Sequence, residues 1–578
     1  MQSHYNTLLM LKRRFDRLFS SGTGIQVLAL LVVSLVFAGI FILCGYYLCD
    51  DAVDWETTVG IFMDPGNFLQ HGDSHCVFRF VVAICGAILV STLLVSTFTN
   101  MFENIGASVR QGKRRYAFNH HILILGNGKK LPHILKALSA ERRDVVVMSE
   151  NPVNVKGEYV YYNGRRDDRD ELVAARADKA DIIYIIGEDD EPGHDSRSLA
   201  SLELLKEICR DAGHDIHCYL TINDIATQEV FQYYRQSENG HLLLVDVIND
   251  SEYYAEQLMV GTDFLPVIRP GEDRECCIVI IGTGSVAQST AYTAAHLCHY
   301  PSFASGRKTT IAFVGIGMRG FMDEMRAARP SLFGMSEYQY MNAKGANTKY
   351  VAGHGDILDI RWEFIDAPAE SDLARHHLEG MIQSPSKDVR IIVCGSNDAE
   401  SMRHTLHLPR TAYGIPSIAV YLEDSEELLD RANATGMYGH LVGYGPAAKS
   451  DDSLFLNRST RGQRVNYIYE QKYGDSTLSQ ETAWYRIPEM SKFSSIYCAN
   501  AMVLRRKCYD LTAPDRTAAY ESEHRRWMMS VLIMGQSQGA QTDKARFIHA
   551  DLVPFDDLSE EEQSKDAVLI DNYELICG

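Results

Sequence analysis

Two long stretches near the amino terminus contain no charged side chain. The first covers residues 25–48 (24 residues) and the second covers 80–99 (20 residues), with Arg79 directly before it. A helix needs about 20 consecutive apolar residues to cross the roughly 30 Å of a hydrocarbon core. The sequence therefore predicts two membrane-spanning helices, at 25–48 and 77–100, that form a hairpin.

The loop between these helices, residues 49–76, is acidic, and basic residues flank the hairpin. The loop has no Lys or Arg, and its acids are Asp50, Asp51, Asp54, Glu56, Asp64 and Asp73. The basic flanks are Lys12, Arg13, Arg14 and Arg17 before the first helix, and Arg110, Lys113, Arg114 and Arg115 after the second. Since cytoplasmic flanks carry excess Lys and Arg, we expect a multi-pass protein of the cytoplasmic (inner) membrane. Both termini, including residues 1–24, would lie in the cytoplasm.

Two other interpretations of the apolar stretches remain open. A signal peptide is disfavoured because the first stretch is too long for its apolar region and no small-residue cleavage site follows. Two buried helices of a soluble core are disfavoured because such helices are rarely apolar on all sides.

The acidic loop has the layout of a short re-entrant pore loop. Residues 55–62 could form a descending helix, and the return turn would then contain Asp64, Pro65, Gly66 and Asn67. Glycine permits close backbone approach, and proline stiffens the entry to the turn. Four copies of Asp64 around an axis would form a carboxylate ring that favours cations. The alternative is an ordinary extracytoplasmic turn.

The composition excludes several classes of function. The net charge of −20 argues against a nucleic-acid partner, because phosphate binding needs a basic face. The 13 cysteines include no Cys-x-x-Cys pair, which indicates a reduced protein without a structural metal. The histidine pairs at 120–121 and 376–377 lack metal-ligand spacing, and no Ser/His/Asp signature or Walker lysine loop is present. We therefore expect no catalytic residues, no metal site and no enzymatic activity.

From residue 120 onward, short apolar segments alternate with helix-length segments. Strand-like segments lie at 121–125, 145–148, 159–162, 181–186 and 218–222, and again at 277–281, 310–314, 390–394 and 417–422. This alternation is typical of β-α-β units in a parallel sheet with right-handed crossovers. Two tandem α/β Rossmann-like domains are predicted, at 117–265 and 274–445. Beyond 455 the strand pattern ends, and helical stretches near 489–509 and 516–535 predict a small, mostly helical domain at 455–578.

Each Rossmann-like unit has a glycine turn after its first strand. The N–H groups of such a turn and the following helix N-terminus bind phosphate, while an acid at the end of the second strand binds ribose hydroxyls. The candidates in the first unit are Gly126, Gly128 and Glu150, with Leu131 at the third glycine position. The candidates in the second unit are Gly282, Gly284 and Ala287, without an acid. The alternative is a fold remnant that binds no ligand.

A further glycine pattern lies in the second unit. The strict form Gly-x-Gly-x-x-Gly occurs at Gly315, Gly317 and Gly320. It follows the second strand of the unit, whereas dinucleotide-binding turns follow the first. We interpret it as a tight strand-to-helix turn.

The order of these parts resembles that of Castor/Pollux-type ion channels. Residues 63–67 (Met-Asp-Pro-Gly-Asn) are similar to the Ala-Asp-Ser-Gly-Asn filter of that family, and 121–126 with Leu131-Pro132 is similar to the start of its RCK (TrkA-N-like) domain. The resemblance covers about 20–445 and implies a tetrameric cation channel whose cytosolic RCK domains form a gating ring. The sequence departs from the family at Pro65 and Phe68, which leaves the selectivity for ions open.

The carboxy-terminal part resembles a different family, the ryanodine-receptor (RyR) repeat domain. The matching stretches are 523–527 (Glu-His-Arg-Arg-Trp), Gly535, 552–558 (Leu-Val-Pro-Phe-Asp-Asp-Leu) and 565–566 (Lys-Asp). The resemblance implies a small, nucleotide-like ligand, for which the candidate contacts are Glu523, His524, Trp527, Lys565 and Asp566. The alternative for Trp527 is a buried core residue. The family usually has Gly-Trp where this chain has Gly535-Gln536.

The predicted fold class is a membrane α-helical hairpin with a pore loop, then two tandem α/β Rossmann-like (RCK/TrkA-N) domains and a small, mostly α-helical RyR domain. The predicted function is a homotetrameric, ligand-gated cation channel with a nucleotide or dinucleotide as regulatory ligand. The alternative is a membrane-tethered nucleotide sensor that conducts nothing and signals to a partner protein. An NAD-dependent oxidoreductase is disfavoured because a general acid and a substrate-cleft motif are missing.

Overall fold

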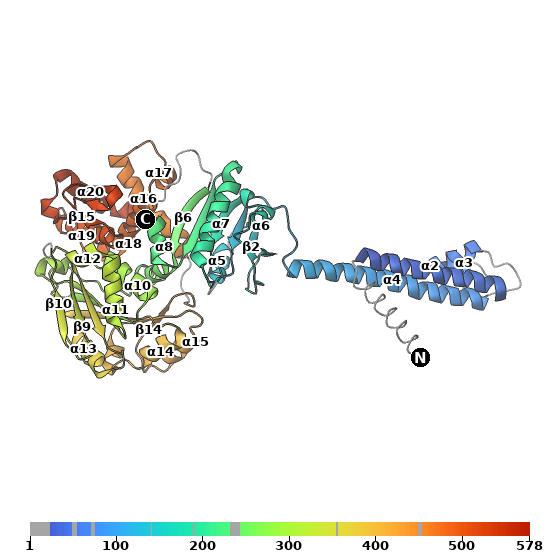
Figure 1. Ribbon diagram of the computed structural model, residues 1–578, viewed down its shortest axis with the longest axis horizontal. Helices are drawn as coiled ribbons and strands as arrows, with labels where there is room; N and C mark the ends of the chain where they lie inside the picture. Colours follow the sequence, from blue (N-terminus) through green and yellow to red (C-terminus); the bar gives the residue numbers. More distant parts are fainter. Residues whose placement is uncertain are drawn as a thin grey trace. The chain divides into compact units, whose positions relative to one another are not determined.

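The computed structural model divides the chain into two compact units, an amino-terminal unit (Met1–Arg114) and a carboxy-terminal unit (Arg115–Gly578). The structure describes residues 23–48, 55–70, 76–139, 142–188, 191–231, 243–353, 357–448 and 453–578 (Figure 1). Four of the predicted loop acids lie outside the described residues: Asp50, Asp51, Asp54 and Asp73.

Helices form the described part of the amino-terminal unit. They are α2 (Thr23–Leu48), α3 (Trp55–Met63), the short 3₁₀ helix η1 (Pro65–Gln70) and α4 (Cys76–Arg110). Ile61 and Phe62 of α3 are buried in one cluster with Val82 and Ala83 of α4. A Cβ atom at Gly86 would lie 2.1 Å from the carbonyl oxygen of Phe62, so this close approach of α3 and α4 needs a glycine.

Among the described residues, no helix is both long enough and apolar enough to cross a membrane. The predicted fold class, with its membrane hairpin, is therefore wrong for the described part of the chain. The predicted location, a multi-pass protein of the inner membrane with both termini in the cytoplasm, is wrong on the same ground.

The carboxy-terminal unit begins with a six-stranded parallel sheet in the order β3-β2-β1-β4-β5-β6. Its strands are β1 (His121–Leu125), β2 (Val145–Ser149), β3 (Val160–Asn163), β4 (Ala180–Ile185), β5 (Ile216–Ile222) and β6 (Leu243–Asn249). The helices between and after them are α5 (Leu131–Leu138), α6 (Arg169–Ala174), α7 (His194–Ile208), α8 (Ile225–Phe231) and α9 (Asp250–Gly261). Every residue of β1, β2 and β6 is buried, as expected for strands covered on both faces. This strand order is that of a Rossmann fold.

A second, eight-stranded sheet follows in the order β10-β9-β11-β8-β7-β12-β13-β14. Its strands are β7 (Glu275–Ile281), β8 (Thr309–Gly315), β9 (Glu337–Met341), β10 (Asn347–Tyr350), β11 (Ile360–Asp366), β12 (Lys387–Val393), β13 (Ile418–Tyr421) and β14 (Leu441–Tyr444). Its helices are α10 (Ser285–Leu297), α11 (Met318–Ala328), α12 (Pro330–Met335), α13 (Asp372–Ile382), α14 (Asp398–Leu406) and α15 (Glu427–Ala434). The order from β11 to β14 repeats the Rossmann order, and the antiparallel pair β9–β10 extends one edge.

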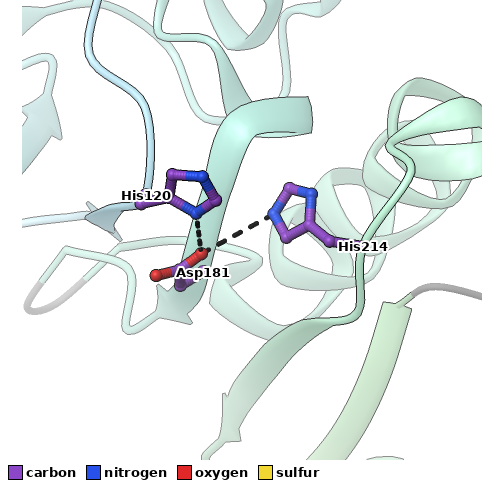
Figure 2. A group of neighbouring side chains, drawn as sticks. All are labelled: His120, Asp181 and His214. Atoms are coloured by element: carbon purple, nitrogen blue, oxygen red, sulfur yellow. Dashed lines mark hydrogen bonds and ion pairs between the residues drawn. The ribbon is translucent and has the colours of Figure 1, made fainter.

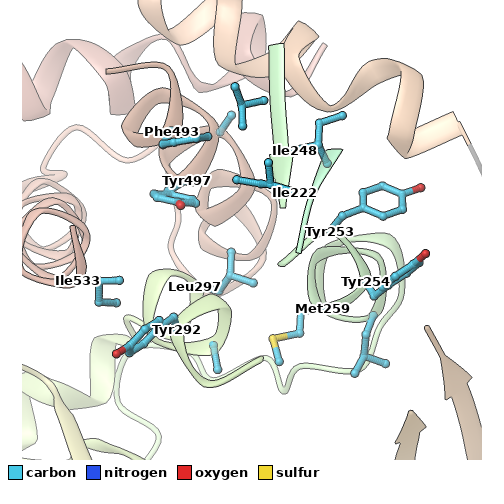
Figure 3. Packing of buried hydrophobic residues seen from close by; sticks show 14 of the residues in the cluster. Ile222, Ile248, Tyr253, Tyr254, Met259, Tyr292, Leu297, Phe493, Tyr497 and Ile533 are labelled. Carbon is cyan, nitrogen blue, oxygen red and sulfur yellow. The ribbon is translucent and has the colours of Figure 1, made fainter. Parts of the chain in front are cut away.

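The carboxy-terminal helices pack against elements of both sheets and form one core with them. They are α16 (Ser453–Tyr473), α17 (Gln480–Arg486), α18 (Glu489–Cys508), α19 (Thr517–Ile533), α20 (Glu560–Asp571) and α21 (Tyr573–Cys577), with a short parallel pair β15 (Ser537–Gln538) and β16 (Ile548–His549). Figure 3 shows Phe493 and Tyr497 of α18 in the same buried cluster as Tyr292 of α10 and Ile248 of β6. Residues from both sheets and from the helical part therefore share one hydrophobic core.

Candidate nucleotide site and the other predicted sites

The glycine turn of the first sheet lies where strands β1, β2 and β4 end. The backbone N–H of Gly126 donates to the carbonyl oxygen of Met148 at 2.8 Å. Gly126 has a φ of +119°, and a Cβ atom there would lie 2.1 Å from the carbonyl oxygen of Gly187. Only glycine fits this conformation and this close approach. The N–H of Gly128 donates to the carbonyl oxygen of Gly187 at 3.0 Å. The turn thus lies next to the end of β2, where a Rossmann fold binds phosphate, and its own chain accepts from the N–H groups of Gly126 and Gly128.

Two lysines lie at the start of helix α5, directly after this turn. Lys130 is buried and forms an ion pair with Asp250 at the start of α9. Lys129 Nζ lies 3.4 Å from Glu423 Oε2 and 3.1 Å from Asp424 Oδ1, which both follow strand β13 of the second sheet. Burial alone would lower the pKa of Lys129, but the hydrogen bond to Asp424 and the nearby carboxylates raise it. The turn before α5 thus carries a cation that pairs with acids of the other sheet.

Glu150 lies one residue beyond β2, where the ribose acid is expected. Its side chain is 44% exposed and forms an ion pair with Arg197 of α7. Arg197 also donates to both oxygens of Asp167, each at 3.1 Å. Hydrogen bonds from Arg165 and Arg197 lower the pKa of Asp167, which keeps it charged. Arg197 therefore contacts one side of the Glu150 carboxylate, and the rest of this side chain stays accessible to solvent.

The second sheet has a similar turn without an acid at the end of its second strand. The N–H of Gly282 donates to Val314 O at 3.0 Å, and a Cβ atom at Gly282 would lie 2.0 Å from Cys394 O. Gly284 has a φ of +105° and Ala287 is buried in α10. This site therefore offers phosphate a turn and a helix N-terminus, but no carboxylate for a ribose.

The glycines at 315–320 form a tight turn between β8 and α11, as predicted. Gly317 has a φ of +74° and precedes the first residue of α11. Asp366, at the end of β11, accepts hydrogen bonds from the N–H groups of Gly317 (3.0 Å) and Met318 (3.3 Å). The N–H groups that a phosphate would use are thus satisfied by a carboxylate of the chain itself.

The five residues predicted for the RyR ligand do not form one surface. Glu523 is fully buried between Arg505 and Arg526, with an oxygen 2.7 Å from a nitrogen of each. Burial alone would raise its pKa, but the charges of Arg526 and Arg505 lower it to about 2. Glu523 therefore belongs to a buried ion cluster that joins α18 and α19.

The other RyR candidates lie on two helices, His524 and Trp527 on α19 and Lys565 and Asp566 on α20. His524 Nε2 donates to Val553 O at 2.8 Å, and its Nδ1 lies 3.3 Å from Asp566 Oδ2. The ring of Trp527 stacks on His524 with centroids 5.6 Å apart and meets the edge of His549 at 4.7 Å. Burial raises the pKa of Asp566. Lys565 pairs with Glu562 one turn earlier on α20. Whether Trp527, half-buried here, contacts a ligand stays a prediction.

The predicted pore residues form a hydrogen-bonded turn between α3 and η1. Asp64 Oδ1 accepts from the N–H of Gly66 at 3.0 Å, and the N–H of Asn67 donates to Asp64 O at 3.0 Å. Pro65 is the first residue of η1. This is the local turn chemistry of aspartate, and a pore role of these residues stays a prediction.

Comparisons with known proteins gave matches only among solved structures. No family model matches the chain, and no curated protein matches it. The GsuK structure bound to ADP is 16% identical with a TM-score of 0.37, and covers 74% of this chain and 94% of its own. The GsuK channel bound to NAD is 14% identical with a TM-score of 0.39 (74% and 81% covered), and the GsuK RCK domain is 12% identical with a TM-score of 0.32 (60% and 79% covered). These structures do not confirm the Castor/Pollux-type or the RyR resemblance.

Proposed function

We propose that this chain is a regulatory nucleotide sensor, with its ligand at the carboxyl ends of β1 and β2. One observation carries the proposal: the hydrogen bond from Gly126 to Met148 places the glycine turn beside the strand end that carries Glu150. A phosphate at this turn would pair with Lys129, and Glu150 would accept from the ribose hydroxyls. The ligand class is therefore a nucleotide or dinucleotide with an intact ribose.

Ligand binding would act on the contact between the two sheets. Lys129 pairs with Glu423 and Asp424, and His133 Nε2 donates to Pro446 O at 2.8 Å, so the start of α5 is attached to the second sheet. A bound phosphate would compete with the two carboxylates for Lys129. A ligand that binds better when Lys129 is released shifts the population toward the released state. Sensing is thereby coupled to the arrangement of the two sheets.

The cation channel, the homotetramer and the RyR-bound ligand remain predictions from the two resemblances. The proposed nucleotide site does not depend on these resemblances, because it is argued from contacts within the carboxy-terminal unit.

Isothermal titration calorimetry of the full chain with ADP and with NAD tests the proposal. Both compounds carry a diphosphate and ribose hydroxyls. Replacing Glu150 with alanine removes charge-assisted hydrogen bonds, so we expect at least about ten-fold weaker binding. Glu324→Ala, at an exposed position of α11, is the matched control and should bind like the wild type. No binding by the wild type at millimolar ligand, or equal affinities of the two variants, would reject the proposed site.

A further inference from the structure

Three potential metal ligands meet at the amino end of the first sheet, opposite the proposed nucleotide site. They are His120, which precedes β1, Asp181 in β4, and His214, which precedes β5 (Figure 2). One ligand atom from each lies within 4.8 Å of the others. His120 Nδ1 lies 2.9 Å from Asp181 Oδ1, and His214 Nε2 lies 3.7 Å from the same oxygen. Both rings thus point at one carboxylate oxygen.

The backbone holds His120 in an unusual conformation. Its φ is +54°, in the left-handed region that few residues other than glycine adopt. The backbone N–H of His120 donates to Lys179 O at 2.8 Å, which attaches this residue to the segment leading into β4. Such strained conformations are concentrated at functional sites. The geometry therefore fixes His120 beside Asp181, although its side chain is 73% exposed.

We propose that His120, Asp181 and His214 bind a divalent metal ion of the zinc class. Two imidazoles and a carboxylate are a ligand set that zinc accepts in a tetrahedral site, with water in the fourth position. His120 would bind through Nδ1, Asp181 through Oδ1 and His214 through Nε2. The aspartate's second oxygen faces Arg143, whose Nη1 lies 3.6 Å away, so Oδ1 is the oxygen left for the metal.

Metal binding changes the ring proton of both histidines. His120 Nδ1 donates to Asp181 Oδ1 in the structure, so its proton has to move to Nε2 before Nδ1 can bind the ion. At His214 one hydrogen bond is exchanged for another. In the structure its Nε2 donates to Ala180 O at 2.9 Å, and its Nδ1 lies 3.4 Å from Ala212 O. A metal at Nε2 moves the ring proton to Nδ1, where Ala212 O accepts it. A backbone carbonyl behind a ligating histidine is the usual arrangement that fixes its tautomer.

The location of the site indicates what the ion would do. His120 directly follows the segment that leads from residue 115 into β1, whose Tyr116 N–H donates to Tyr162 OH at 2.7 Å. An ion shared with β4 and the loop before β5 would hold this segment against the sheet. The site is open to solvent and far along β1 from Gly126, so its role is to fix the chain there rather than to contact a nucleotide.

Zinc titration of the full chain, produced without a histidine tag, tests this assignment. Calorimetry measures zinc affinity, and the ligand-field absorption of bound Co²⁺ reports nitrogen and oxygen ligands. The variants are His120→Asn, which tolerates the left-handed backbone, Asp181→Asn and His214→Gln. The control is His376→Asn, at an exposed position of α13.

We expect one zinc ion per wild-type chain and the same in the control. Each of the three variants should bind at least about ten-fold more weakly, since even the loss of an outer-shell partner costs about 10–100-fold. Thermal unfolding in the presence of a chelator should be alike for all five proteins, which separates metal binding from folding. Absence of stoichiometric zinc binding by the wild type, or variants that bind like the control, overturns the assignment. Three variants test the same ion. If one of them fails to fold, the zinc affinities of the other two still decide whether the assignment holds.

Discussion

The indole Nε1 of Trp484 donates a hydrogen bond to Asp246 Oδ1 over 3.0 Å and joins helix α17 to strand β6. Trp484 has no exposed surface. Tyr485 OH donates to the other oxygen of Asp246 at 3.0 Å, and Lys492 Nζ lies 3.8 Å from Oδ1. A buried carboxylate thus attaches the helical part to the first sheet.

Replacing Asp246 with alanine should destabilise the protein strongly. The change leaves Lys492 with one fewer buried counter-charge and leaves two donors, Trp484 and Tyr485, without their acceptor. Breaking a buried ion pair costs about 3–5 kcal/mol. Chemical denaturation monitored by tryptophan fluorescence measures this loss. Asp263→Asn, which removes a partner of Lys507 at the surface, is the control and should leave the midpoint unchanged. Equal stabilities of the two variants would show that the Asp246 contact contributes little.

Glu489 should make stability fall as the pH rises through neutrality. Burial raises its pKa to about 7, although the charge of Lys492 lowers it, and the usual value is 4.5. The folded state therefore retains a proton that the unfolded state releases between these values. Its contribution is fully present below pH 4.5 and is lost as the pH rises through about 7, on the order of 3 kcal/mol in all.

The variant Glu489→Gln isolates this effect. It carries no titrating group at this position, so the free energy of unfolding should change less between about pH 5 and pH 8 than in the wild type. Urea denaturation at several pH values gives both curves. Parallel curves would mean that Glu489 does not titrate in this range.

The two glycine turns should differ in their tolerance of alanine. At Gly126 a new Cβ atom meets the carbonyl oxygen of Gly187 at 2.1 Å, in addition to the unfavourable φ. Gly284 has a similar φ, but no atom lies within 4 Å of a Cβ atom there. Backbone strain of this kind costs about 1–3 kcal/mol. The free energy of unfolding should therefore fall by about this amount in Gly284→Ala and by clearly more in Gly126→Ala. Denaturant midpoints measure both losses, and the reverse order would refute this view of the first turn.

Glu523 should behave as a structural residue and not as a ligand contact. Glu523→Gln leaves Arg505 and Arg526 buried without their common carboxylate, and we expect a loss of about 3–5 kcal/mol. Trp527→Phe keeps an apolar ring in a half-buried position and should cost about 1 kcal/mol. Thermal unfolding of both variants compares them. A Glu523→Gln protein as stable as the wild type would return Glu523 to the list of candidate ligand contacts.

The parts of the fold that could be predicted are those whose pattern is local. Residues 122–125 are consecutive apolar residues followed by glycine, and the predicted strand 121–125 has the bounds of β1 in the structure. Strand β11 was missed because Arg361 and Glu363 alternate with Trp362 and Phe364, which gives no continuous apolar run. The membrane hairpin shows the opposite error: its prediction depends on apolar runs alone, and no helix among the described residues is both long enough and apolar enough to cross a membrane.

The candidate sites follow the same rule. Gly126 and Glu150 could be placed together because adjacent parallel strands end at one edge of a sheet. The contact of Lys129 with Glu423 could not, because it joins two sheets across 294 residues. His120, Asp181 and His214 were passed over because their proximity arises from strand order and not from spacing in the sequence. Helical spacing placed Glu523 near Trp527 but could not show that other helices bury it.

A cycle of two ligands and two proteins tests whether Glu150 binds the ribose of a nucleotide. Binding of ADP and of 2′,3′-dideoxy-ADP is measured with the wild type and with Glu150→Ala, which has no side-chain acceptor. In the wild type the loss of the sugar hydroxyls should weaken binding by about ten-fold or more. In the variant the two ligands should bind alike, because the partner of those hydroxyls is gone. A wild type that does not distinguish the two ligands, or a variant that still does, would contradict the account.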